Sequence, residues 1–194
     1  MIDVVLLVEL SWCFIWLVKK RLQTALLYTG GVFAAGYTAW QTSGRVSRWF
    51  ASPAHPAFLW IERNITTNAK AVSILAHYVP PQPVDTSMTQ THWIAIHVAK
   101  VLVFCAITLA VFVTFAVIVF LRRAIWDLGE ESPEVRLDAR WITVFTALTC
   151  TLYTGVFSVT LFANLAWVRP FQGLAGLIGQ SVAMHLYALL FHTP

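Results

Sequence analysis

The chain has 194 residues, of which 58% are hydrophobic and 11% are charged, and its mean hydropathy is +0.70. Charged residues make up about a quarter of a typical soluble domain, so this composition excludes an ordinary water-soluble domain. We expect an all-α integral membrane protein with one membrane domain, residues 1–194. The net charge of +4 comes from basic residues at the ends of apolar segments, which excludes a nucleic-acid-binding patch.

The first two apolar segments are residues 2–18 and 22–40, and only Lys19, Lys20 and Arg21 separate them. Each is close to the length of about 20 residues that a helix needs to cross the hydrocarbon core. We therefore predict two transmembrane helices joined by a tight, basic turn.

The long connection that follows carries clusters of aromatic residues suited to the lipid headgroup level. Trp49 and Phe50 form one cluster, and Phe58 and Trp60 lie in the next. Residues 46–79 are expected to form interfacial helices that lie on the membrane surface.

Two further transmembrane helices are predicted at residues 101–121 and 141–168, which gives four in total. The connection between them carries four arginines alongside its acidic residues, and the turn between the first two helices carries three basic residues. Lysine and arginine favour the cytoplasm, so both connections are expected inside and both termini outside. The basic residues of the second connection are Arg122, Arg123, Arg136 and Arg140.

Residues 173–191 are apolar but contain Gly173, Gly176 and Gly179, together with Gln180 and Ser181. These residues make full insertion less favourable, so we expect an interfacial helix. A fifth crossing is the alternative.

Small residues recur on one face of two predicted spans. Close packing between small residues drives helix association in lipid, so these faces are expected to pack against each other. A threonine on such a face can bond to its own helix carbonyl and needs no chemical role. The predicted packing residues are Gly30, Gly31 and Ala35 in the second span and Thr143, Ala147, Thr151, Thr154 and Ser158 in the fourth.

Glu9 is the candidate polar site inside the membrane. It lies about 10 residues, or ~15 Å, from the basic turn at roughly 1.5 Å per residue. A carboxyl at that depth is costly and usually faces the protein interior. We expect a protonated Glu9 that donates a hydrogen bond to Thr108, Thr151, Tyr28 or Tyr153. A proton or ion relay is the alternative.

The sequence contains no catalytic motif such as G-x-S-x-G, H-E-x-x-H or a P-loop. The three cysteines lie in apolar segments without metal-binding spacing. We therefore expect neither an enzyme nor a bound cofactor or metal.

The layout resembles the bacterial colicin V production protein family. The similar parts are the start Met1-Ile2-Asp3, the basic hairpin that leads into a span with Gly30, the Asp138-Ala139-Arg140 entry to the fourth span, and Arg169-Pro170. The resemblance covers most of the chain as topology and implies a bacterial inner-membrane protein linked to toxin export and envelope integrity. It implies no catalytic residues.

These observations predict a membrane scaffold or accessory protein in the bacterial cytoplasmic membrane. Its partners are expected to be lipids and either further copies of itself or another membrane protein. One alternative is an oligomeric channel or transporter subunit that uses Glu9. Another is an accessory subunit of a larger respiratory or secretion complex.

Overall fold

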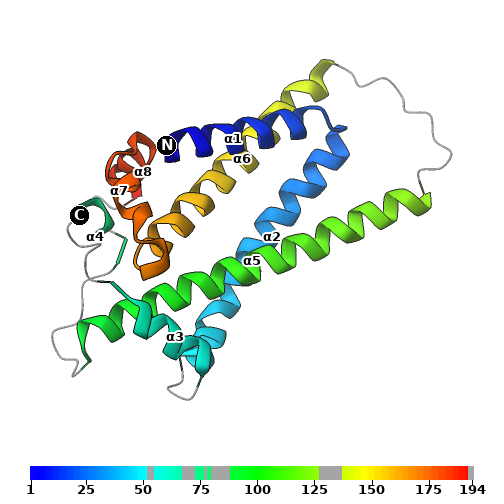
Figure 1. The fold of residues 1–194 in the computed structure, drawn as a ribbon. Helices are drawn as coiled ribbons and strands as arrows, with labels where there is room; N and C mark the ends of the chain where they lie inside the picture. The colour runs from blue at the N-terminus through cyan, green and yellow to red at the C-terminus, as the bar shows by residue number, and fades with distance from the viewer. Residues whose placement is uncertain (52–54, 67–72, 77, 80–87, 127–136, 192–194) are drawn as a thin grey trace.

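The fold is all-helical, as the computed structural model in Figure 1 shows. The structure describes residues 1–51, 55–66, 73–76, 78–79, 88–126 and 137–191. In this part of the chain, the only β-type pairing outside helices is an isolated antiparallel bridge between Ile65 and Val168. The helices are α1 (Ile2–Val18), α2 (Leu22–Phe50), α3 (Pro56–Asn64), α4 (Ser73–Ala76), α5 (Gln90–Trp126), α6 (Leu137–Leu165), η2 (Arg169–Phe171), α7 (Gly173–Gly179) and α8 (Val182–Phe191).

Two of the described helices are long and apolar enough to cross a membrane. These are the Gln90–Leu121 part of α5 and the Arg140–Leu165 part of α6. α1 has 17 residues and is about 26 Å long. α2 has 29 residues, but polar residues become frequent toward its C-terminal end. The all-α fold is thus confirmed, and the crossing of the membrane by α1 and α2 stays a prediction.

The helix bounds agree with the sequence analysis at α1 and differ elsewhere. α2 continues to Phe50 and α5 begins at Gln90, because a helical hydrogen-bond ladder does not end where apolar side chains end. Of the predicted interfacial region 46–79, residues 46–50 belong to α2, and α3 and α4 follow; residues 52–54, 67–72 and 77 lie outside the described part. The expected helix over 173–191 is instead two helices, which separate at Gln180 and Ser181.

The four long helices form two pairs. α1 lies along α6, and α2 packs most extensively against α5 (Figure 1). We call the end of the molecule that carries α3, α4, α7 and α8 the capped end. The opposite end, which holds Lys19, Lys20 and Arg21 in the turn between α1 and α2, is called the basic end.

The main core lies at the capped end, where the short helices cover the ends of α1, α5 and α6. Phe58 and Trp167 are among its largest fully buried side chains. Alanines in α5 and α6 let the backbones approach closely. Core residues from different elements include Leu6, Phe58, Ile65, Leu75, Ala95, Ala99, Ala163, Trp167, Ile178 and Met184.

Asp3 in the first turn of α1 caps the start of α8. Its Oδ1 accepts hydrogen bonds from the Ser181 hydroxyl at 2.6 Å and the Ala183 N–H at 3.0 Å, and its Oδ2 accepts one from the Val182 N–H at 3.2 Å. The Ser181 hydroxyl oxygen accepts a bond from the Met184 N–H at 3.3 Å. The first amides of a helix have no partner within the helix, so this arrangement satisfies them and ties α8 to α1.

Candidate functional site

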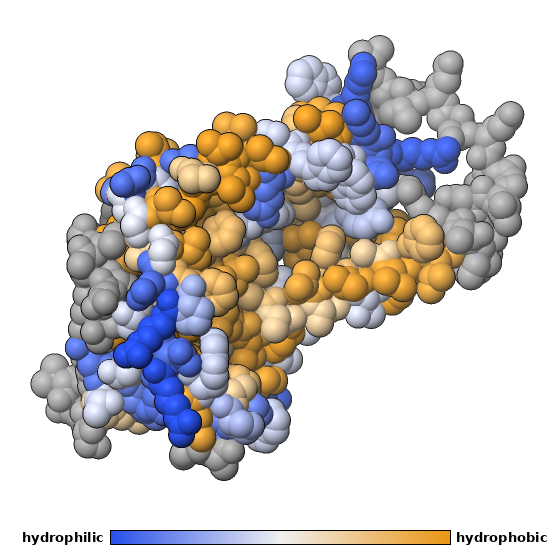
Figure 2. Space-filling view, viewed as in Figure 1, coloured by the Kyte–Doolittle hydropathy of each residue, from blue (hydrophilic) through white to orange (hydrophobic). Residues whose placement is uncertain are grey.

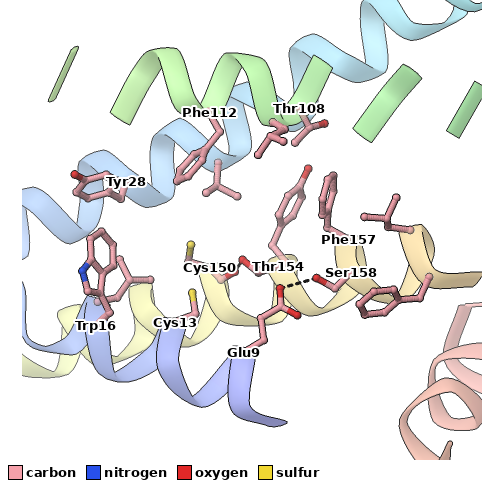
Figure 3. Close-up of a pocket in the computed structure, with 16 residues that line it drawn as sticks. Glu9, Cys13, Trp16, Tyr28, Thr108, Phe112, Cys150, Thr154, Phe157 and Ser158 are labelled. Carbon is pink, nitrogen blue, oxygen red and sulfur yellow. Dashed lines mark hydrogen bonds between the residues drawn. The ribbon is translucent and has the colours of Figure 1, made fainter. Parts of the chain in front are cut away.

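A cavity of about 530 Å³ lies between the two helix pairs. α1 and α6 form one wall, and α2 and α5 form the other (Figure 3). Most lining side chains are apolar or aromatic. The polar ones are Glu9, Ser158, Thr154, Thr108, Tyr28 and Tyr153, together with the thiols of Cys13 and Cys150.

Glu9 lies on the α1 wall and bonds across to α6. Its Oε1 accepts a hydrogen bond from the Ser158 hydroxyl at 2.7 Å (Figure 3). The approach is close because the neighbouring α6 position is Gly155. A Cβ placed on Gly155 would lie 3.2 Å from Leu10 Cδ2, so even an alanine there would require the Leu10 side chain to shift slightly.

The partner of Glu9 differs from the sequence-based prediction. Thr108, Tyr28 and Tyr153 line the same cavity, but the hydrogen bond comes from Ser158, and Glu9 accepts it. The prediction assumed that the basic residues of both connections lie at one level. Leu17 instead packs against Ala147, well inside α6. α6 therefore begins beyond the turn between α1 and α2. As a result, the α6 residue opposite Glu9 is Ser158 and not Thr151.

The small-residue face of α6 meets α1 as well as α2. Ala147 and Cys150 form a buried cluster with Leu17 of α1, and Tyr28 and Val32 of α2 lie at its edge. Thr143, Thr151 and Ser158 are also buried, and Thr154 is half-buried. The Thr154 hydroxyl donates to the carbonyl of Cys150 at 3.0 Å, so it bonds within its own helix.

The small residues predicted for α2 do not all pack against the small-residue face of α6. Gly31 is buried against the ring of Phe115 in α5, and Ala35 is fully buried. Gly30 is exposed, with no atom within 4 Å of a Cβ placed there. Adjacent helix positions are about 100° apart, so Gly30 and Gly31 cannot share one contact face. Gly36 of α2 also contacts α6, against the hydroxyl of Tyr153.

An aromatic pair marks the cavity toward the basic end. The rings of Trp16 and Tyr28 meet edge to face with centroids 4.9 Å apart. The Nζ of Lys20 lies 4.7 Å from the centroid of the Trp16 ring. A lining tryptophan thus already faces a cation at this end.

The sequence analysis missed three residues that shape the site. Gly36 lies against Tyr153 of α6, Gly155 lies against Leu10 of α1, and Asp3 holds α8 in place. A glycine within an apolar helix signals close packing, but it does not indicate which neighbour approaches. The bond from Asp3 to Ser181 links positions far apart in the chain, and sequence periodicity carries no signal for such a contact.

In comparisons with known proteins, no family model, curated protein sequence or solved structure matches this chain.

Proposed function

We propose that this chain is an integral membrane protein that crosses the bilayer with α1, α2, α5 and α6. The observation that supports this most is the surface of the long helices. Large apolar side chains are exposed along them, and Figure 2 shows this hydrophobic surface between hydrophilic zones at the two ends of the molecule. Soluble monomers rarely expose apolar patches of this extent. The exposed residues include Val4, Leu7, Val8 and Trp12 in α1, Leu109, Val113, Val117 and Phe120 in α5, and Phe145, Leu148 and Leu152 in α6.

The proposed orientation places the basic end in the cytoplasm. Lys19, Lys20 and Arg21 lie in the short turn there, and such residues are retained on the cytoplasmic side. The capped end and the N-terminus of α1 then lie on the extracytoplasmic face. Exposed apolar residues on α8, such as Val182 and Leu186, suit a helix that lies at the lipid surface.

Labelling of single introduced cysteines tests this orientation. Arg45→Cys and Glu130→Cys are expected to react with a membrane-impermeant maleimide from opposite sides of the membrane. Glu130 lies outside the described residues. The unsubstituted protein, with its native Cys13, Cys105 and Cys150, provides the background reactivity. Reaction of both variants from the same side contradicts the four-crossing arrangement.

Within the membrane, the proposed role is that of a non-catalytic scaffold or accessory protein of the bacterial inner membrane. The resemblance noted above relates this role to toxin export and envelope integrity. Its partner is a further copy or another membrane protein, because the exposed face of α1 offers an apolar surface for helix packing. Purification in mild detergent with mass measurement tests this proposal. A complex larger than the 21.8 kDa chain is expected after the detergent contribution is subtracted, and a lone monomer contradicts it.

An oligomeric channel or transporter subunit is the second candidate. The observation in its favour is that Glu9 lines a cavity rather than a closed helix contact. The scaffold proposal predicts that Glu9→Gln keeps the membrane level and the cellular activity of the protein. Loss of activity at normal membrane levels would favour the channel or transporter. Co-purification with large stoichiometric partners would favour an accessory subunit of a respiratory or secretion complex.

A further inference from the structure

We propose that the cavity between the helix pairs binds a hydrophobic organic cation of single charge, with Glu9 as the counter-charge and the aromatic walls around the apolar body. This inference goes beyond a scaffold role and does not depend on which partner the protein has.

The size and walls of the cavity suit a small molecule. Its volume of about 530 Å³ lies within the roughly 300–1,000 Å³ of typical ligand pockets, which combine apolar walls with a few polar groups. The aromatic side chains come from all four long helices. They are Trp16, Tyr28, Phe112, Tyr153, Phe157 and Phe162.

The charge of the lining favours a cation. Glu9 supplies the carboxyl group of the lining, and no lysine, arginine or histidine of the described residues lines the cavity. Ser158 bonds to Oε1, while Oε2 receives no hydrogen bond from the described part of the chain. An ionised carboxylate in apolar surroundings is costly unless it is paired. A bound cation would supply the missing partner.

The aromatic walls add to the attraction. The face of an aromatic ring is electronegative and attracts a cation within about 6 Å of its centroid. Trp16 already shows this behaviour toward the ammonium of Lys20, at 4.7 Å. Phe112 of α5 and Phe157 of α6 extend into the cavity from opposite walls, and Phe157 lies near Ser158 (Figure 3).

The donor set suits an organic cation better than a metal ion. No group of three or more His, Cys, Asp and Glu side chains among the described residues is arranged to hold a metal. A small ion at Glu9 would also leave most of the apolar wall unfilled. In a cation that carries aromatic or alkyl groups, the charge pairs with the single carboxylate and the apolar groups fill the cavity.

Binding of tetraphenylphosphonium to the purified full-length protein tests the proposal. Equilibrium dialysis in mild detergent, with protein-free micelles as the background, measures the dissociation constant. Uncharged tetraphenylmethane in the same detergent reports what the apolar walls bind without charge. Saturable binding of the cation, at least about tenfold tighter than that of the neutral molecule, is expected because the cation gains a desolvated charge pair.

Two variants locate the site. Glu9→Gln keeps the acceptor for Ser158 and removes the charge, and it is expected to weaken cation binding at least about tenfold. Glu62→Gln is the matched control, because Glu62 bonds to His92 at the capped end and does not line this cavity. That control is expected to bind like the native protein.

Three results would overturn the proposal: no saturable binding of the cation, equal binding of the cation and the neutral molecule, or unchanged binding by Glu9→Gln. The second result would mean that lipid chains or other apolar molecules fill the cavity. If Glu9→Gln fails to fold, Val32→Trp fills the cavity from α2 and keeps the carboxylate. Folded Val32→Trp that still binds the cation at native strength would exclude this site.

Discussion

The two ends of the molecule are built differently. At the capped end, short helices close over the long ones, and a continuous buried core joins α1, α3, α5, α6, α7 and α8. Toward the basic end, the buried cluster consists of Leu17, Ala147 and Cys150, beside a cavity between the helix pairs. The same chain thus combines a densely packed end with an end where a small buried cluster lies beside a cavity.

The packed end should be the most sensitive to loss of a large side chain. Phe58 is fully buried in α3, so Phe58→Ala is expected to lower the free energy of unfolding by about 3–5 kcal/mol. Trp60→Ala on the same helix is the control, because Trp60 is exposed. Denaturant titration in detergent, followed by circular dichroism, measures both. Equal effects of the two substitutions would show that the capped end is not the main core.

The basic end should lose less stability from a comparable deletion. Leu17 is buried, but its small cluster adjoins a cavity into which neighbours can relax. Leu17→Ala is therefore expected to cost about 2 kcal/mol, at the low end for such changes. The same titration measures it, and a cost that matches Phe58→Ala would remove the contrast between the two ends.

The contact between α2 and α5 gives an effect of intermediate size. A Cβ on Gly31 would meet the ring of Phe115, so Gly31→Ala is expected to destabilise the protein by about 1–2 kcal/mol. Its neighbour Gly30 has open space around it. Gly30→Ala is expected to be neutral or stabilising by up to about 1 kcal/mol, because alanine favours helix. Thermal unfolding of both variants compares them, and a reversed order would contradict the described contact.

The cap of α8 is expected to give the smallest loss of stability and the most local one. Asp3→Ala removes acceptors for the Val182 and Ala183 amides and is expected to cost about 1 kcal/mol. Hydrogen exchange at these two amides should become faster. Exchange within α7 serves as the internal control and should not change. Uniform acceleration across both helices would mean that Asp3 supports the whole capped end rather than one helix start.

Much of the fold follows from the sequence, because apolar segments bounded by charges indicate long helices. The bounds of α1 were predictable from Ile2 to Val18, while α2 and α5 continue through polar residues that hydropathy does not distinguish from loops. The break between α7 and α8 coincides with Gln180 and Ser181, which had suggested only a weakened span.

The candidate site was predictable in its key residue but not in its geometry. Glu9 is conspicuous in sequence because a carboxyl is rare in an apolar segment. Its bond to Ser158 depends on how far α6 extends past the turn between α1 and α2, which is a tertiary property. The contacts of Gly31 with Phe115 and of Gly36 with Tyr153 likewise depend on helix rotation.

The cap formed by Asp3 has a consequence for the order of biosynthesis. The carboxylate lies 178 residues before the hydroxyl of Ser181 that it binds. At about 5–20 residues per second, a ribosome finishes α8 on the order of ten to forty seconds after Asp3 is made. α1 is therefore made well before its partner in this bond, and the other helices are synthesised in between. The bond between α1 and α8 therefore forms only after nearly the whole chain has been made, and truncation before Ser181 would remove the partner of Asp3.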